Sequence, residues 1–371
     1  MVNVKDYLQM VVKNYYQGLK GATALDFKVI GMGNFSVVFS MGDAVYKIST
    51  EQSFIDASVS IANINKLADS GVNVPKTYTI TTSTENPKCV RELQEIVRKS
   101  TSFNNFINLL QDFLKKYDVS DTNNIQVCSI MQQRIGGNRI FYSRERFYDR
   151  LDLIKKEILQ QAIKYKDNPP QQYKITLEII SQAQKVAEEN LDRFVKIPVD
   201  KYAKFIYDGL VLAKNNIMVD NINKSNFKYV KGKGFYFIDL DGLSSDNNQR
   251  FAQQNASAKN PFNYTIGNVY SQVDIDPTLY TPSMSLKALH LSAKISNALC
   301  SVYLDNLDDE YIVNQIKGYV ADIKTNPNNP LNIAYTHFPS NIDQTTANKY
   351  LSRFANEMGI ISGNIISMQK D

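Results

Sequence analysis

Hydrophobic and polar residues alternate along most of this chain with the two periods that mark helices and strands. Apolar residues three or four positions apart predict amphipathic helices, and short apolar runs bounded by glycine or polar residues predict strands. Helices are predicted over 4–20, 52–69, 90–117, 144–165, 172–194, 202–214, 288–304, 309–323 and 345–356. Strands are predicted over 27–30, 37–40, 44–48, 77–82, 125–131, 227–230 and 235–238. Most strands precede residue 137 and most helices follow it, which indicates an α+β protein.

The composition limits the classes of protein to which this chain can belong. Its 371 residues, 43% of them hydrophobic, suffice for two or three folded units. No apolar run approaches the ~18 residues of a membrane span, and the first residues lack the order of a secretory signal. We therefore expect no transmembrane segment. The formal net charge of +5 permits an acidic partner such as phosphate, lipid or nucleic acid without requiring one. Among these, no nucleic-acid partner is expected.

Cysteine and histidine are too sparse for several kinds of site. The three cysteines lie far apart and share no metal-binding spacing, so we interpret them as free thiols in a reducing compartment. The two histidines, His290 and His337, exclude a zinc site built from several histidines. His290 lies in an apolar helical run, where a packed side chain is the simpler interpretation.

The acids after the strand at 235–238 indicate a metal site. Asp239 and Asp241 follow this apolar strand directly. Asn226 immediately precedes the strand at 227–230, which is predicted to pair with the strand at 235–238. An acid at the end of a buried strand is costly to desolvate unless a cation or a donor meets it. Carboxylate and amide oxygens suit a hard divalent ion such as Mg²⁺. The alternative is a surface hairpin with an acidic end.

Two glycines separate the first two predicted strands. Gly31 and Gly33 lie in the sequence Gly-Met-Gly-Asn-Phe-Ser, where their main-chain N–H groups can approach a phosphate. A dinucleotide-binding turn needs a helix directly after the loop, but a β-branched strand follows here. A plain hairpin remains the alternative. Lys47, inside the third strand, is a poor core residue unless its ammonium meets an anion.

The order of these motifs resembles the protein-kinase superfamily. The resemblance consists of a glycine-rich hairpin, a strand lysine, a loop asparagine and a strand-end aspartate, spread over residues 27–243. It implies an α+β, bilobal kinase-like fold. An N-terminal helix in residues 1–26 would precede a small lobe (27–136) that carries a helical insertion at about 88–120. A mainly helical large lobe with C-terminal helices would follow (137–371).

The resemblance also implies a cofactor and a set of site residues. ATP would bind between the lobes together with Mg²⁺ or Mn²⁺. Lys47 would contact the α- and β-phosphates, and the hinge near residues 131–137 would meet adenine. The residues implied for nucleotide binding are Gly31, Gly33, Phe35, Ser36, Val38, Lys47, Met131 and Gln133. Asn226 and Asp239 would hold the metal, with Asp241 as either a further acid of the site or a turn residue.

The chain departs from the family pattern at two positions. Its 52–69 helix has no glutamate to pair with Lys47, which leaves Asp56 or Glu51 as the candidate partner.

Five residues before Asn226, where the family has its catalytic aspartate, the chain has Asn221, with Asp220 one residue earlier. Either the loop bulges, so that Asp220 accepts the hydroxyl proton while Lys224 steadies the γ-phosphate, or Asn221 occupies the position and no general base is present.

Three functions follow as alternatives from these residues. The first is an atypical ATP-dependent kinase that phosphorylates a protein hydroxyl or, alternatively, a phosphoinositide or a small molecule. The second is a pseudokinase scaffold that binds a nucleotide or a partner without transfer. The third is a kinase fold that performs another nucleotide-dependent transfer. The Asn-, Lys- and Ile-rich composition is similar to that of bacterial kinase-like effectors, which implies a cytoplasmic protein or, alternatively, one delivered into a host cell.

Overall fold

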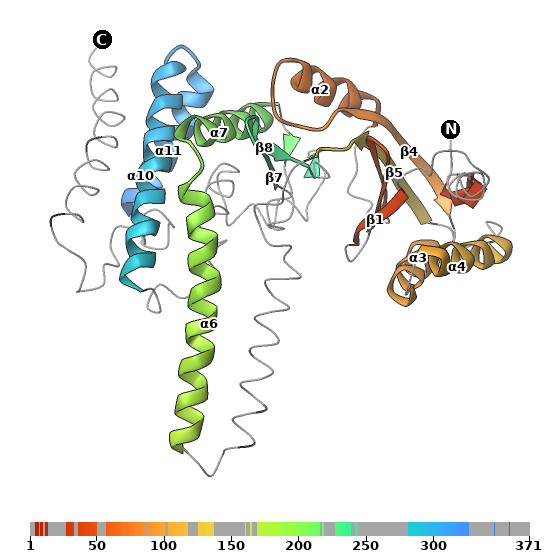
Figure 1. Ribbon diagram of the computed structural model, residues 1–371. Coiled ribbons are helices and arrows are strands. Elements are labelled where there is room, and N and C mark those ends of the chain that lie inside the picture. The colour runs from red at the N-terminus through yellow and green to blue at the C-terminus, as the bar shows by residue number, and fades with distance from the viewer. Residues whose placement is uncertain are drawn as a thin grey trace. The chain divides into compact units, whose positions relative to one another are not determined.

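The arrangement of helices and strands is shown in Figure 1 as a computed structural model of the 371-residue chain. The residues that the structure describes are 4–6, 8–9, 12–13, 27–32, 36–49, 57–85, 88–100, 103–117, 125–136, 160, 164, 169–215, 217–218, 227–238, 242–243, 281–325, 345 and 356.

Five strands join into one antiparallel sheet. They are β1 (Phe27–Met32), β2 (Ser36–Met41), β3 (Ala44–Ser49), β4 (Thr77–Glu85) and β5 (Ile125–Gln133). Their order across the sheet is β1-β2-β3-β5-β4, so β3 is central and β4 is an edge strand. The β2–β3 turn is tight because Gly42 adopts a left-handed φ of 57°, which glycine tolerates without steric cost. All five lie where the sequence predicts strands.

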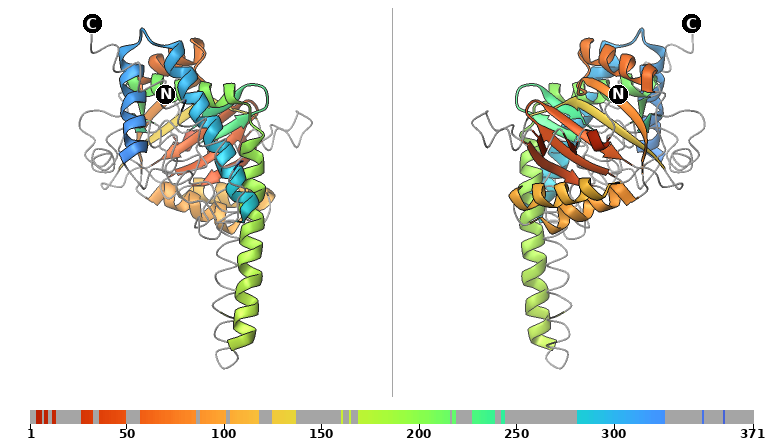
Figure 2. Two further views of the ribbon diagram at one scale, coloured as in Figure 1. Left: turned by 90° about the vertical axis from the view of Figure 1, so that its left-hand side faces the viewer. Right: turned by 90° about the vertical axis from the view of Figure 1, so that its right-hand side faces the viewer.

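One face of this sheet is covered by helices. Residues 4–6, 8–9 and 12–13 are helical, and α3 (Lys88–Lys99) and α4 (Phe103–Lys116) lie side by side against the sheet (Figure 2). Every second residue of β2 and β3 points into this core. The buried residues are Val4, Leu8, Val12, Val37, Phe39, Tyr46, Ile48, Cys89, Val90, Leu93, Phe106, Ile107, Leu110, Phe113, Tyr117 and Val127. The predicted insertion therefore supplies one half of a hydrophobic core.

The insertion contains two helices where the sequence pattern predicts one. The apolar period runs from 90 to 117, but α3 ends at Lys99 and α4 begins at Phe103. The Ser100 hydroxyl donates to the main-chain oxygen of Ile96 at 2.5 Å. Serine side chains compete in this way with the helical hydrogen bonds, which explains why a helix ends here although its apolar period continues.

Four longer helices make up most of the described part of the chain after residue 168. They are α6 (Pro169–Val195), α7 (Val199–Lys214), α10 (Pro282–Asp305) and α11 (Glu310–Thr325). Helix α10 packs against both α6 and α7, as Figure 1 also shows. Both α6 and α10 begin several residues before their predicted starts, at prolines. Proline is favourable in a first helical turn, because the N–H that it lacks would have no intrahelical partner there.

A short hairpin packs on α7. Its strands are β7 (Phe227–Val230) and β8 (Gly234–Phe237), joined through the positive-φ residues Gly232 and Gly234. The two predicted strands and their Lys-Gly-Lys-Gly turn are thus confirmed. Two-residue strands occur at β6 (Ile217–Met218) and β9 (Gly242–Leu243).

The chain divides into two compact units. The first comprises Met1–Gly136 with Leu240–Asn248, and the second comprises Gly137–Asp239 with Gln249–Asp371. The described part of the first unit combines the five-stranded antiparallel sheet with helices, whereas helices dominate that of the second, which agrees with the predicted α+β class. None of the helices in the described ranges is both long and apolar enough to cross a bilayer.

Candidate functional site

Lys47 lies in the middle strand of the five-stranded sheet, on the face opposite the helical core. Its neighbours along β3, Tyr46 and Ile48, point into that core. Because side chains alternate along a strand, Lys47 points to the other face. Its directly opposite partners are Val38 on β2 and Ile130 on β5. Lys47 and Val38 are half-buried. Two apolar side chains therefore flank the stem of a lysine whose charged end lies on this face, which we call the Lys47 face.

The residues paired across the sheet at Lys47 form a row that continues through β2 to Gly31 in β1. Gly31 in β1 pairs with Val38, and the β1–β2 register shifts between Val29 and Gly31, which marks a bulge or irregularity. The structure thus brings Gly31, Val38 and Lys47 into one row across three strands. Ser36 opens β2 opposite Ser49. Ile130, which the sequence analysis missed, completes the row; alternation along β5 could have pointed to it.

The two predicted hinge residues occupy different surroundings. Met131 pairs with Tyr46 and packs against the helical core, on the opposite side from Lys47. Gln133 is exposed at the end of β5, and its main-chain N–H donates to Lys76 at 2.7 Å. The next residue, Arg134, donates from its main chain to Asp43 at 2.7 Å and from its guanidinium to Gly42 at 3.2 Å. Gln133 and Arg134 are therefore hydrogen-bonded to Lys76 on one side and to the β2–β3 turn on the other. The contact of this segment with adenine stays a prediction.

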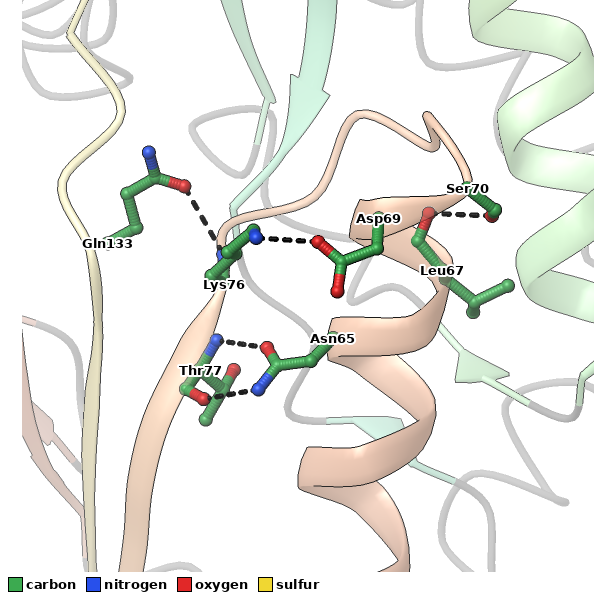
Figure 3. A network of polar contacts seen from close by, with 7 residues as sticks. All are labelled: Asn65, Leu67, Asp69, Ser70, Lys76, Thr77 and Gln133. Carbon is green, nitrogen blue, oxygen red and sulfur yellow. Dashed lines mark hydrogen bonds and ion pairs between the residues drawn. The ribbon is translucent and has the colours of Figure 1, made fainter.

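Helix α2 (Ala57–Asp69) is attached to the edge strand β4 through a polar network (Figure 3). The Asn65 side chain accepts from the N–H of Thr77 and donates to its C=O, both at 2.8 Å. Asp69, the acid that α2 itself contains, pairs with Lys76 at 2.5 Å, with both side chains largely exposed. The hydrogen bond that the Lys76 ammonium donates to Asp69, followed by the charge of Asp69, raises the pKa of Lys76. Asp69 therefore forms a surface ion pair with Lys76. The two acids predicted as partners of Lys47, Asp56 and Glu51, lie outside the described residues.

An aromatic cluster fixes the β7–β8 hairpin on α7. The Phe205 ring lies 5.4 Å from Phe227, 4.8 Å from Phe235 and 5.0 Å from Phe237, stacked on the last with 13° between the planes. Tyr202 lies 5.5 Å from Phe235. Phe227 and Phe237 are direct partners in the hairpin, so the chain enters and leaves it at one end.

Asp208 is a buried acid on the same helix. Its side chain is 0% exposed and accepts from Lys204, one turn earlier, at 2.9 Å; the Lys204 side chain is 35% exposed. Burial, followed by the charge of Asp208, raises the pKa of Tyr236 on β8. The sequence analysis missed Asp208. The signal available was the spacing of Lys204 and Asp208, which lie four residues apart in the predicted helix and therefore on one side of it.

Several predicted site residues lie outside the described residues. They are Gly33, Phe35, Asp220, Asn221, Lys224, Asn226, Asp239 and Asp241. Within the described part of the chain, no group of three or more histidine, cysteine, aspartate or glutamate side chains is arranged to hold a metal ion.

The described geometry therefore consists of a lysine-bearing sheet face in the first unit and an anchored hairpin in the second. No protein-family model matches the chain, and no curated protein sequence matches it significantly.

Proposed function

We propose that the chain is a divergent kinase-like phosphotransferase that uses ATP with Mg²⁺ or Mn²⁺ and phosphorylates a protein hydroxyl. The observation that carries the proposal is the position of Lys47. It lies on the central strand β3, on the face not covered by the helical core, in one row with Gly31 and Val38. A lysine placed in this way supplies a positive charge in the same row as a glycine, two strands away, that carries no side chain.

This arrangement supports phosphate binding. In protein kinases, a glycine-rich loop covers the phosphates of ATP and a lysine of the third strand contacts them. Here Gly31 belongs to β1 and Lys47 to β3. Helix α2 follows β3 in the chain and precedes β4 and β5, which agrees with the order of elements along the small lobe that the resemblance implies. Lys47 is proposed to neutralise the α- and β-phosphates, and Val38 and Ile130 to hold its stem.

The hairpin supports the metal site. Asn226 immediately precedes Phe227, and Asp239 follows Phe237 by two residues. Because Phe227 and Phe237 are paired, the two strand ends that lead into Asn226 and Asp239 in the sequence lie at the same end of the hairpin. We propose that these two side chains supply oxygen ligands to Mg²⁺, which would bind the phosphates and neutralise their charge.

In the proposed reaction, the acceptor oxygen attacks the γ-phosphorus and the bond to the leaving ADP oxygen breaks. The hydroxyl proton passes to Asp220 if the loop bulges. Asp220→Ala should then reduce turnover by roughly 10²-fold or more while ATP still binds, because only a base is removed. Asn221→Ala should be nearly silent. Normal transfer by the Asp220→Ala protein would show that Asp220 is not the base.

Nucleotide binding tests the proposal most directly. ATP should raise the melting temperature of the wild-type protein when Mg²⁺ or Mn²⁺ is present, because a ligand of the native state stabilises it by mass action. Lys47→Met should abolish the shift, whereas Lys66→Met, an exposed lysine of α2, should leave it unchanged. Transfer of labelled γ-phosphate to protein, lipid or small-molecule acceptors then identifies the substrate class. Binding without transfer would favour the scaffold, and no shift with either metal would refute the proposal.

A further inference from the structure

One side chain of α2 satisfies the main chain at the start of β4. β4 is the edge of the sheet, and an edge strand leaves alternate N–H and C=O groups without a strand partner. Thr77 opens β4 and is 1% exposed. Its N–H and C=O are both satisfied by the Asn65 amide at 2.8 Å (Figure 3). A buried main-chain group that loses its partner is costly, so Asn65 does for Thr77 what a sixth strand would otherwise do.

Lys76 and Thr77, at the start of β4, also link α2 to β5. Lys76, just before Thr77, is joined to Asp69 of α2 at 2.5 Å and accepts from the Gln133 N–H at 2.7 Å. The Gln132 amide lies 3.5 Å from the Thr77 hydroxyl. β5 in turn pairs with β3, where its Ile130 lies opposite Lys47. A continuous set of hydrogen bonds therefore joins α2, β4, β5 and the strand that carries Lys47.

We propose that Asn65 is a positioning residue that holds α2 on the edge strand and thereby fixes the Lys47 face for the nucleotide. This role rests on the proposed function, because it assigns to Asn65 a part in nucleotide binding. Asn63, two residues earlier on the same helix, is exposed and provides a matched control.

Amide exchange at Thr77 reports the contact itself. Because the Thr77 N–H donates to Asn65, Asn65→Ala should lower its protection factor roughly tenfold to hundredfold, the equivalent of two neutral hydrogen bonds. Asn63→Ala should leave it unchanged. In Asn65→Asp, an ionised carboxylate would face the Thr77 carbonyl, whereas a protonated carboxyl can again donate and accept. The introduced carboxyl would thus have a raised pKa. The protection factor of the Thr77 N–H in this variant should therefore be near wild type at about pH 4.5 and fall as the pH rises to about 8.

Nucleotide affinity reports the positioning role. Asn65→Ala should weaken ATP binding by about tenfold, whereas Asn63→Ala should leave it unchanged. Asn65→Asp should recover affinity at low pH together with Thr77 protection, which a general loss of stability would not produce. If the wild-type protein binds no nucleotide, both the proposed function and this role are wrong. If the wild type binds and Asn65→Ala binds equally well, the role of Asn65 alone is overturned.

Discussion

Replacing Phe205 with alanine should be among the most damaging substitutions in the second unit. The side chain is 2% exposed and contacts the rings of Phe227, Phe235 and Phe237. A buried Phe→Ala substitution costs about 3–5 kcal/mol. Each aromatic pair contributes roughly 0.5–1.5 kcal/mol beyond its buried area. Three such pairs place Phe205→Ala in the upper half of that range, at about 4–5 kcal/mol.

The hairpin should report this loss before the rest of the chain does. Hydrogen exchange measured on peptides covering β7, β8 and α7 gives the local opening free energy, which avoids treating two units as one transition. Phe205→Leu keeps most of the volume and should cost about 1–2 kcal/mol, because it loses only the ring contacts. Tyr207→Ala, at a 37% exposed position of the same helix, should change stability by about 0.5 kcal/mol or less.

A loss below about 1 kcal/mol in Phe205→Ala would refute the view that this ring anchors the hairpin. The same variant should weaken the Mg²⁺-dependent ATP shift, because Asn226 and Asp239 flank the hairpin in sequence. A normal shift in a variant whose hairpin has lost its protection would instead contradict the proposed metal site.

Two further predictions concern charged pairs in the second unit. Hydrogen bonds from Ser283 and then Lys287 lower the pKa of Glu188 below its ordinary 4.5. Its charge therefore stabilises the fold above pH 4.5 and loses this effect as the pH falls through the lower folded value. Glu188→Gln should be less stable than wild type at neutral pH by under about 1 kcal/mol, and pH-dependent unfolding should show the difference closing in acid. Lys204→Met should destabilise more than Asp208→Asn in chemical unfolding, because it removes an ion-pair partner of a buried carboxylate; equal losses would contradict this.

The sequence by itself predicted most of the described elements. Alternation marked β2 and β3, and the Lys-Gly-Lys-Gly turn marked the β7–β8 hairpin. These signals are local, since a residue's side of a helix or strand depends on its immediate neighbours. Element ends were less predictable. The starts at Pro169 and Pro282 and the break after Ser100 depend on single capping or competing side chains that leave the apolar period unchanged.

Only the tertiary structure decided which of these residues meet. Lys47 could be read as a lysine in a strand, but its neighbours Val38 and Ile130 follow from pairing across three strands. The packing of Met131 against the helical core and the Asn65–Thr77 contact likewise depend on how separate elements meet. Periodicity encodes whether a side chain is buried, whereas the identity of its partner depends on register and packing between elements, and no local pattern carries that information.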